Sequence, residues 1–199
     1  MNPVQSRLDR DPNTKTDTTA DVNADVANWL RRPGLGKYAK IESERRFLLT
    51  GIPADASDPR FIEDRYIRGT RLRLRRVQVG SQVVYKLCQK VRPDENTPST
   101  AAITNIYLDE AEYNQLCRLP AATLRKTRHV WQVSHHTFVV DEFHDDLTSL
   151  VLAEIELPES PSELYLPTPI GKEVTADERF TGGYLAHATP DERARILTL

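Results

Sequence analysis

The chain has little cysteine: Cys88 and Cys117 are its two cysteines in 199 residues, and their separation matches no metal-ligand spacing. The first residues lack the apolar stretch of a secretory signal. No apolar run approaches the roughly 20 residues needed to cross a bilayer. These absences exclude a cysteine metal site, and they predict a cytoplasmic protein with reduced thiols and no membrane partner.

An excess of charge of one sign is also missing. Lysine and arginine together number 27 and aspartate and glutamate 29, so the formal net charge is only −2. A nucleic acid polymer or a membrane surface is usually matched by a global excess of basic residues. We therefore expect neither as a partner, and any site for a polyanion must be a local concentration of basic side chains.

Common catalytic motifs are absent as well. The sequence has no glycine-rich phosphate loop, no nucleophile elbow and no paired histidine motif for a metal. The five histidines are scattered, and His135 and His136 fall at the tip of an expected hairpin. The candidate chemistry must therefore lie in other charged residues.

The N-terminal part differs in composition from the rest. Residues 1–37 are rich in Asp, Asn, Thr and Arg and have few large apolar residues, so they cannot bury enough surface to offset the entropy of ordering. We expect a disordered tail there and a single domain over residues 38–199. The alternative for part of the tail is a short amphipathic helix over residues 22–30 that docks on the domain.

Beyond the tail, short runs bounded by turn residues predict a mainly β (α+β) domain. Strands are expected over residues 41–49, 61–68, 70–77, 82–90, 102–108, 128–134, 137–143 and 150–157. We expect a turn or a helix start at 58–59, and helices over 110–118, near 175–178 and from 189–190. Eight strands linked mostly by tight turns predict an antiparallel sheet that is curled or closed into a barrel.

Two of these strands carry paired carboxylates. Glu42 and Glu44 lie two residues apart, as do Glu154 and Glu156. Side chains at this spacing lie about 6.6 Å apart on one face of a strand, and two carboxylates there repel by roughly 2 kcal/mol at an effective dielectric near 20. Water or a metal ion must offset that repulsion. Asp141 and Glu142 are adjacent, so only one of them can share an inward face.

Basic residues show the same alternation, and most of them lie on other strands. The side chains that share a face are, by strand, Arg46, then Arg71, Arg73 and Arg75, then Lys86 and Lys90, then Lys126 and Arg128. On any one strand, a half-exposed sheet with its arginines in water would explain the pattern. The acids nevertheless cluster on two strands and the bases on three or four, so a closed sheet would enclose an acidic and a basic wall. Carboxylates bind hard divalent cations, and Arg and Lys bind phosphate oxygens; such a lumen suits a metal-bound polyanion.

These motifs resemble, in their order along the chain, the CYTH family, also called triphosphate tunnel metalloenzymes. Glu42, Glu44 and Arg46 match the hallmark E-x-E-x-K strand of the family. Further matches are residues 70–75, 86–90, 126–128, 141–143, 152–156 and 171–175. The similarity extends from about residue 38 to the end.

The resemblance implies a closed eight-stranded antiparallel tunnel in which bases hold a triphosphate and glutamates hold Mg²⁺ or Mn²⁺. The implied phosphate ligands are Arg46, Arg71, Arg73, Arg75, Lys86, Lys90, Lys126 and Arg128. The implied metal ligands are Glu42, Glu44, Glu154 and Glu156, assisted by Asp141 or Glu173. The expected catalytic residues are Glu42, Glu44, Arg46 and Arg128.

The sequence departs from the family pattern at several points. Arg46 replaces the hallmark lysine, and because a guanidinium does not lose its proton, this residue can clamp phosphate but cannot act as a general base. A metal-activated water is then the expected nucleophile. Residues 105–107 lack the Arg and Glu expected in members that act on organic triphosphates, and residues 143–150 lack the usual glycines.

The expected function is divalent-metal-dependent hydrolysis of a small-molecule triphosphate, most simply inorganic triphosphate. One alternative keeps the tunnel for an adenylate cyclase or another organic triphosphatase. A second is a non-catalytic binder of polyphosphate or nucleotide, because Arg46 and residues 143–150 could mark lost activity. A barrel without phosphate function is the remaining alternative. The choice between Mg²⁺ and Mn²⁺ and the formation of a homodimer stay open.

Overall fold

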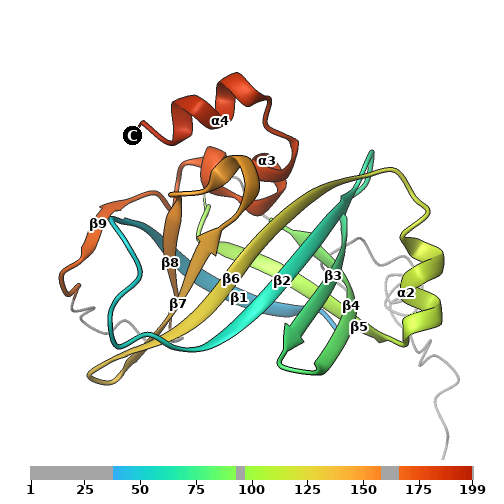
Figure 1. The fold of residues 1–199 in the computed structure, drawn as a ribbon, viewed down its shortest axis with the longest axis horizontal. Coiled ribbons are helices and arrows are strands. Elements are labelled where there is room, and N and C mark those ends of the chain that lie inside the picture. Colours follow the sequence, from blue (N-terminus) through green and yellow to red (C-terminus); the bar gives the residue numbers. More distant parts are fainter. Residues whose placement is uncertain (1–37, 93–96, 158–165, 199) are drawn as a thin grey trace, which may run out of the picture. The chain divides into compact units, whose positions relative to one another are not determined.

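The computed structural model describes residues 38–92, 97–157 and 166–198 (Figure 1). The expected tail over residues 1–37, with its alternative docked helix, lies outside the described residues. Among the residues described, no helix has the length and apolar character needed to cross a membrane.

Eight antiparallel strands form a closed barrel. They are β1 (Lys40–Leu49), β2 (Ser57–Ile67), β3 (Leu72–Val79), β4 (Gln82–Val91), β5 (Thr100–Leu108), β6 (Ala121–Val133), β7 (His136–Phe143) and β8 (Val151–Glu156). Their order is β5-β4-β3-β2-β6-β7-β8-β1, and β1 pairs back with β5 to close the ring. A short ninth strand, β9 (Ile170–Glu173), adds to β1. The predicted closed eight-stranded antiparallel barrel is confirmed.

The interior of the barrel changes from charged to apolar toward one end. Leu48, Leu124 and Leu152 lie two residues from Arg46, Lys126 and Glu154, so strand alternation places each leucine on the same face as its charged neighbour. These leucines pack with Phe143, Phe180 and Leu185. Phe180 and Leu185 come from η2 (Glu178–Phe180) and α3 (Gly182–His187), which therefore cover this end. In Figure 1, α3 and α4 (Pro190–Ile196) lie at the top of the barrel.

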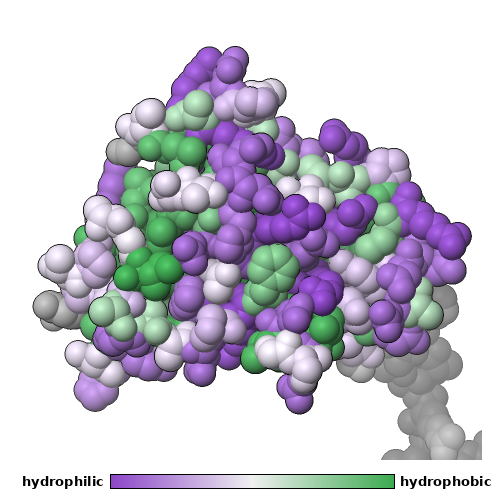
Figure 2. Space-filling view, in the orientation of Figure 1, coloured by the Kyte–Doolittle hydropathy of each residue, from purple (hydrophilic) through white to green (hydrophobic). Residues whose placement is uncertain are grey.

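A second apolar cluster lies on the opposite face of β1, β7 and β8. Phe47, Phe138, Val140 and Ala153 are fully buried in it. Phe47 follows Arg46 on β1 and points to the opposite face of the strand, so this cluster lies on the outer side of the wall whose inner side is charged. Figure 2 shows hydrophilic side chains over most of the β2, β3 and β6 region, with apolar side chains gathering toward β7 and β8.

The helix caps follow local sequence signals. Helix α2 (Glu110–Leu116) begins with the predicted capping box of Asp109 and Glu112. Helix α4 begins with Pro190 after Thr189, as predicted. The predicted cap near residue 175 was misplaced by two residues, because the side chain of Asp177 caps η2. Thr175 instead accepts a hydrogen bond from the backbone N–H of Arg46.

Two strand starts differ from the prediction. Residues 58–59 were expected as a turn or a helix start but lie within β2, where Asp58 has a φ of 50° and the register with β6 shifts before Arg60. A β-bulge of this kind accommodates a proline that cannot donate to the ladder. Strand β6 begins at Ala121 instead of residue 128, because its pairing with β2 continues to that point.

Candidate functional site

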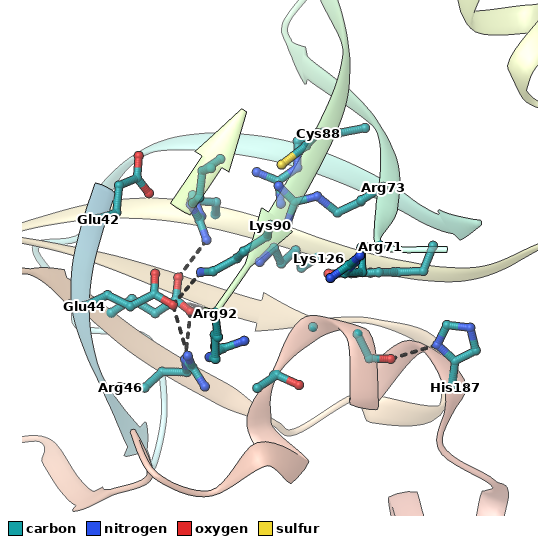
Figure 3. A pocket seen from close by; sticks show the side chains of 18 of the residues that line it. Glu42, Glu44, Arg46, Arg71, Arg73, Cys88, Lys90, Arg92, Lys126 and His187 are labelled. Atoms are coloured by element: carbon teal, nitrogen blue, oxygen red, sulfur yellow. Dashed lines mark hydrogen bonds and ion pairs between the residues drawn. The ribbon is translucent and has the colours of Figure 1, made fainter. Parts of the chain in front are cut away.

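A cavity of about 430 Å³ lies inside the barrel (Figure 3). Its acidic lining is Glu42, Glu44 and Glu154, and its basic lining is Arg46, Arg71, Arg73, Arg75, Lys90, Arg92, Lys126 and Arg128. The structure thus brings together every predicted phosphate ligand except Lys86. A neighbouring cavity of about 770 Å³ shares Glu42, Glu44, Arg128 and Glu154 with the first and adds Glu156.

The register between β1 and β8 sets the acidic wall. Glu44 pairs with Glu156, and Arg46 pairs with Glu154. The guanidinium of Arg46 donates to Glu44 Oε1 over 3.0 Å and to Glu154 Oε1 over 3.1 Å. Arg46 therefore bridges the two acidic strands. It is only 2 % exposed, and it also donates to the Phe180 carbonyl.

The carboxylate of Glu44, in this wall, has a strongly lowered pKa. Its Oε1 accepts a second hydrogen bond from Lys90 Nζ over 2.7 Å, and Figure 3 shows Arg46 and Lys90 converging on it. Burial opposes ionisation of Glu44, but Lys90 and then Arg46 outweigh it and lower its pKa to about 2. The group is ionised at neutral pH and is a weak proton acceptor.

Asp141 occupies a different position from the one predicted. It is 1 % exposed, and its two oxygens accept hydrogen bonds from Arg128, both over 2.7 Å, and from Lys126. Burial opposes its ionisation, yet Arg128 and Lys126 hold its pKa well below the usual range. Asp141 does not line the cavity. Its lone pairs are committed to these two bases, so its geometry makes it their counterion and does not support the predicted role in metal binding.

Glu173 also lies away from the cavity. Arg45 donates to both of its oxygens, over 3.0 and 2.6 Å. Arg45 alternates with Arg46 on β1, so this pair lies on the other face of the strand from the cavity. The position of Glu173 likewise does not support its predicted part in the metal site.

Lys86 shares the inward phase of β4 with Cys88 and Lys90, but it does not line the cavity. Its ammonium lies 4.8 Å from the centre of the Tyr107 ring, a cation–π contact. Lys86 is therefore not part of the group of bases that lines the cavity opposite the glutamates.

Sequence reasoning missed Asp64, which supports the basic wall. It is 1 % exposed, and Arg75 donates to its two oxygens over 2.6 and 2.7 Å. Arg73 Nε lies 3.5 Å from the same carboxylate without forming a hydrogen bond. Burial opposes ionisation of Asp64, but Arg75 and then Arg73 keep its pKa well below the usual range. The available signal was the position of Asp64 on a strand next to the arginines, although the adjacent Glu63 left open which of the two acids faces inward.

The remaining missed residues come together only in three dimensions. Tyr66, Arg92, Gly182 and His187 all line the cavity. A Cβ at Gly182 would lie 2.1 Å from the Tyr66 hydroxyl oxygen, so only glycine permits this approach of α3. Burial, with the nearby Arg46, lowers the pKa of Arg92. No sequence motif links α3 to β2.

Comparison with known proteins points to one family. No protein-family model matches the chain. The inorganic triphosphatase of Acetivibrio thermocellus is 40% identical over 70 residues, which are 35% of this chain and 44% of that protein. The match thus spans less than half the length of the curated relative.

A solved structure described as the hypothetical protein NE1496 is 25% identical, with a TM-score of 0.52 over 75% of this chain and 99% of that one. A second, described as the inorganic triphosphatase NE1496, is 24% identical and shows the same fold, with a TM-score of 0.52 over 75% and 96% of the two chains.

These similarities support the resemblance to the CYTH family that the sequence motifs indicate. The barrel of this chain has the fold of these solved structures, and the cavity occupies the interior of the barrel, which we call the tunnel.

The carboxylates of this tunnel fit a hard divalent cation by type. Glu42, Glu44, Glu154 and Glu156 line one cavity and supply only oxygen donors, as Mg²⁺ and Mn²⁺ prefer. In the present side-chain arrangement, no three His, Cys, Asp or Glu residues of the described ranges are close enough to hold one ion. Glu44 and Glu154 are instead occupied by Arg46, Lys90 and Arg128. Binding of a cation would require these carboxylates to leave their basic partners.

The ion pairs of Glu44 give a prediction for stability against pH. The pKa of Glu44 is lowered from 4.5 to about 2 on folding, so its contribution is complete above about pH 4.5 and is lost as the pH falls toward 2. We expect the difference in unfolding free energy between wild type and Glu44→Gln to shrink over this interval, as measured by urea denaturation at several pH values. The other carboxylates titrate in both proteins, so their contributions cancel in the difference between the two unfolding free energies. A difference that stays constant from pH 6 to pH 2.5 would contradict the assignment.

Proposed function

We propose that this protein hydrolyses inorganic triphosphate inside the tunnel with the help of Mg²⁺ or Mn²⁺. The observation that carries the proposal is the division of the cavity lining: bases from β3, β4 and β6 face glutamates from β1 and β8. The similarity to the Acetivibrio thermocellus triphosphatase supports the same reaction class. A cytoplasmic location and a small-molecule partner, as opposed to a polymer, belong to the same proposal.

The basic wall would bind and orient the phosphate chain. Arg73 supports this role because it lines the cavity and its Nε makes no hydrogen bond to the described residues. Asp64 and Asp141 hold neighbouring bases in place from behind. Preorganised cations of this kind stabilise charge on a transferring phosphoryl group at no cost of reorganisation.

The acidic wall would hold the cation through Glu42, Glu44, Glu154 and Glu156. A divalent cation supplies charge neutralisation and an activated water at neutral pH when bound. Arg46 cannot take a proton from that water, since a guanidinium is always protonated. Arg46 instead bridges the acidic strands and clamps phosphate.

The test is phosphate release from inorganic triphosphate with Mg²⁺ and with Mn²⁺, beside ATP, GTP and thiamine triphosphate. We expect turnover of inorganic triphosphate that EDTA abolishes. Glu42→Ala should lower kcat/KM by about 100-fold, as the loss of one preorganised electrostatic contact does elsewhere. The control is Glu110→Ala, since Glu110 is exposed on α2.

Different outcomes favour the other functions. Cyclic AMP formed from ATP would favour a cyclase, and tight triphosphate binding without turnover in either metal would favour a non-catalytic binder. The absence of phosphate release, with Glu42→Ala indistinguishable from wild type in binding, would reject the proposal.

A further inference from the structure

A side cavity opens from the end of the tunnel that is remote from the glutamates. It measures about 490 Å³ and shares Thr70, Arg71 and His187 with the main cavity. The residues that line only the side cavity are Ile67, Gly69, Leu72 and Gln89. In Figure 3, Arg71 and His187 lie on the opposite side of the view from Glu42 and Glu44. A phosphate chain held at the glutamates would therefore direct its other end toward this junction.

The junction offers positive charge without a competing carboxylate. The lining of the side cavity contains no Asp or Glu. Within the described part of the chain, Arg71 forms no ion pair, whereas Arg73 and Arg75 both lie beside Asp64. The guanidinium of Arg71 is thus available for an anion, and charge-assisted hydrogen bonds from Arg to phosphate are strong.

The ring of His187 is fixed so that one nitrogen is left for a ligand. Its Nδ1 lies 2.9 Å from the carbonyl oxygen of Gly183, and because a carbonyl can only accept, Nδ1 carries the hydrogen. The ring of Tyr66 packs edge-on against it at 6.3 Å. No hydrogen bond joins Nε2 to any residue that the structure describes, so this nitrogen can share a proton with a ligand.

We propose that His187, together with Arg71, binds the second free end of inorganic triphosphate while the first end lies at the glutamates. The protein thereby selects this substrate over triphosphate esters such as ATP, in which one end of the chain carries the nucleoside. A terminal phosphate has a second ionisable oxygen, which can form a charge-assisted hydrogen bond with the free imidazole nitrogen. The esterified phosphate of ATP lacks this oxygen. The side cavity has no Phe, Tyr or Trp in its lining to stack a base. This inference rests on the proposed function, since it assumes a triphosphate in the main cavity.

Two readouts test the role of His187. The first is the ratio of kcat/KM for inorganic triphosphate to that for ATP. We expect His187→Ala to lower this ratio by about 10- to 100-fold, the range of one charge-assisted hydrogen bond, mainly through KM for inorganic triphosphate. The control is His129→Ala, which should leave the ratio unchanged, since His129 lies beside Glu142 on the face of β6 that points away from the tunnel.

The second readout needs no turnover. In the wild type, inorganic triphosphate should raise Tm more than ATP at equal concentration, and His187→Ala should remove that difference. An unchanged ratio in His187→Ala, or equal Tm shifts with both compounds in the wild type, overturns the role of His187 alone. No Tm shift with either compound contradicts the proposed function as well.

Discussion

Replacing Asp141 by alanine is expected to lower the free energy of unfolding by about 3–5 kcal/mol, the usual cost of removing one partner from a buried charge cluster. Asp141 accepts two hydrogen bonds from Arg128 and one from Lys126, and Lys126 is only 7 % exposed. Without the carboxylate, two cations would face each other in the barrel wall. Burial already lowers the pKa of Lys126, so its deprotonation would limit the loss. Urea denaturation at pH 7 measures the effect.

The matched control is Asp146→Ala. Asp146 also pairs with an arginine, Arg193, over 2.7 Å, but its side chain is 70 % exposed. Exposed ion pairs contribute about 1 kcal/mol or less. Similar losses in the two variants would show that the buried cluster is not the stabilising element that its geometry indicates.

Replacing Arg73 by glutamine is expected to reduce kcat/KM for inorganic triphosphate by about 10²–10³-fold, which corresponds to about 2.7–4 kcal/mol of transition-state stabilisation. Arg73 lines the cavity, and Asp64 lies 3.5 Å from its Nε. Burial lowers its pKa, but Asp64 more than offsets this, so the pKa of Arg73 is raised and the charge is permanent. A change in kcat, beyond KM alone, would show that the contact strengthens in the transition state.

The control lies on the same strand. Arg76 follows Arg75 on β3, so its side chain points to the opposite face, and it donates to Gln78. Arg76→Gln should stay within about twofold of wild type, since it lies outside the tunnel. Equal effects of the two substitutions on kcat/KM would mean that only the overall charge of the protein affects activity. That result would contradict the phosphate-binding role of Arg73.

The local periodicity of the sequence was sufficient for several elements. Alternation on single strands predicted that Arg71, Arg73 and Arg75 share one face, and the cavity lining contains all three. The capping signals at Asp109 and Thr189 predicted two helix starts correctly, because a cap depends on residues within one turn. The β2 bulge at Asp58 escaped prediction, because it depends on the pairing of β2 with β6.

The choice between Asp141 and Glu142 shows where local periodicity stops. Both adjacent acids lie on β7, and alternation requires them to face opposite sides without specifying which faces inward. The register pairs Asp141 with Arg128 and leaves Glu142 near His129 on the other face. That inward position made Asp141 a counterion of the basic wall and removed it from the acidic one.

The sequence by itself determined most of the strands and the charged face of each, since strand alternation and turn chemistry act over a few residues. Only the tertiary structure decided which face is the lumen, because closure depends on the pairing of β1 with β5 across distant parts of the chain. It also decided that Arg46 bridges Glu44 and Glu154, and that α3 brings Gly182 and His187 to Tyr66. Contacts of this kind join residues far apart in sequence, and no local pattern encodes their register.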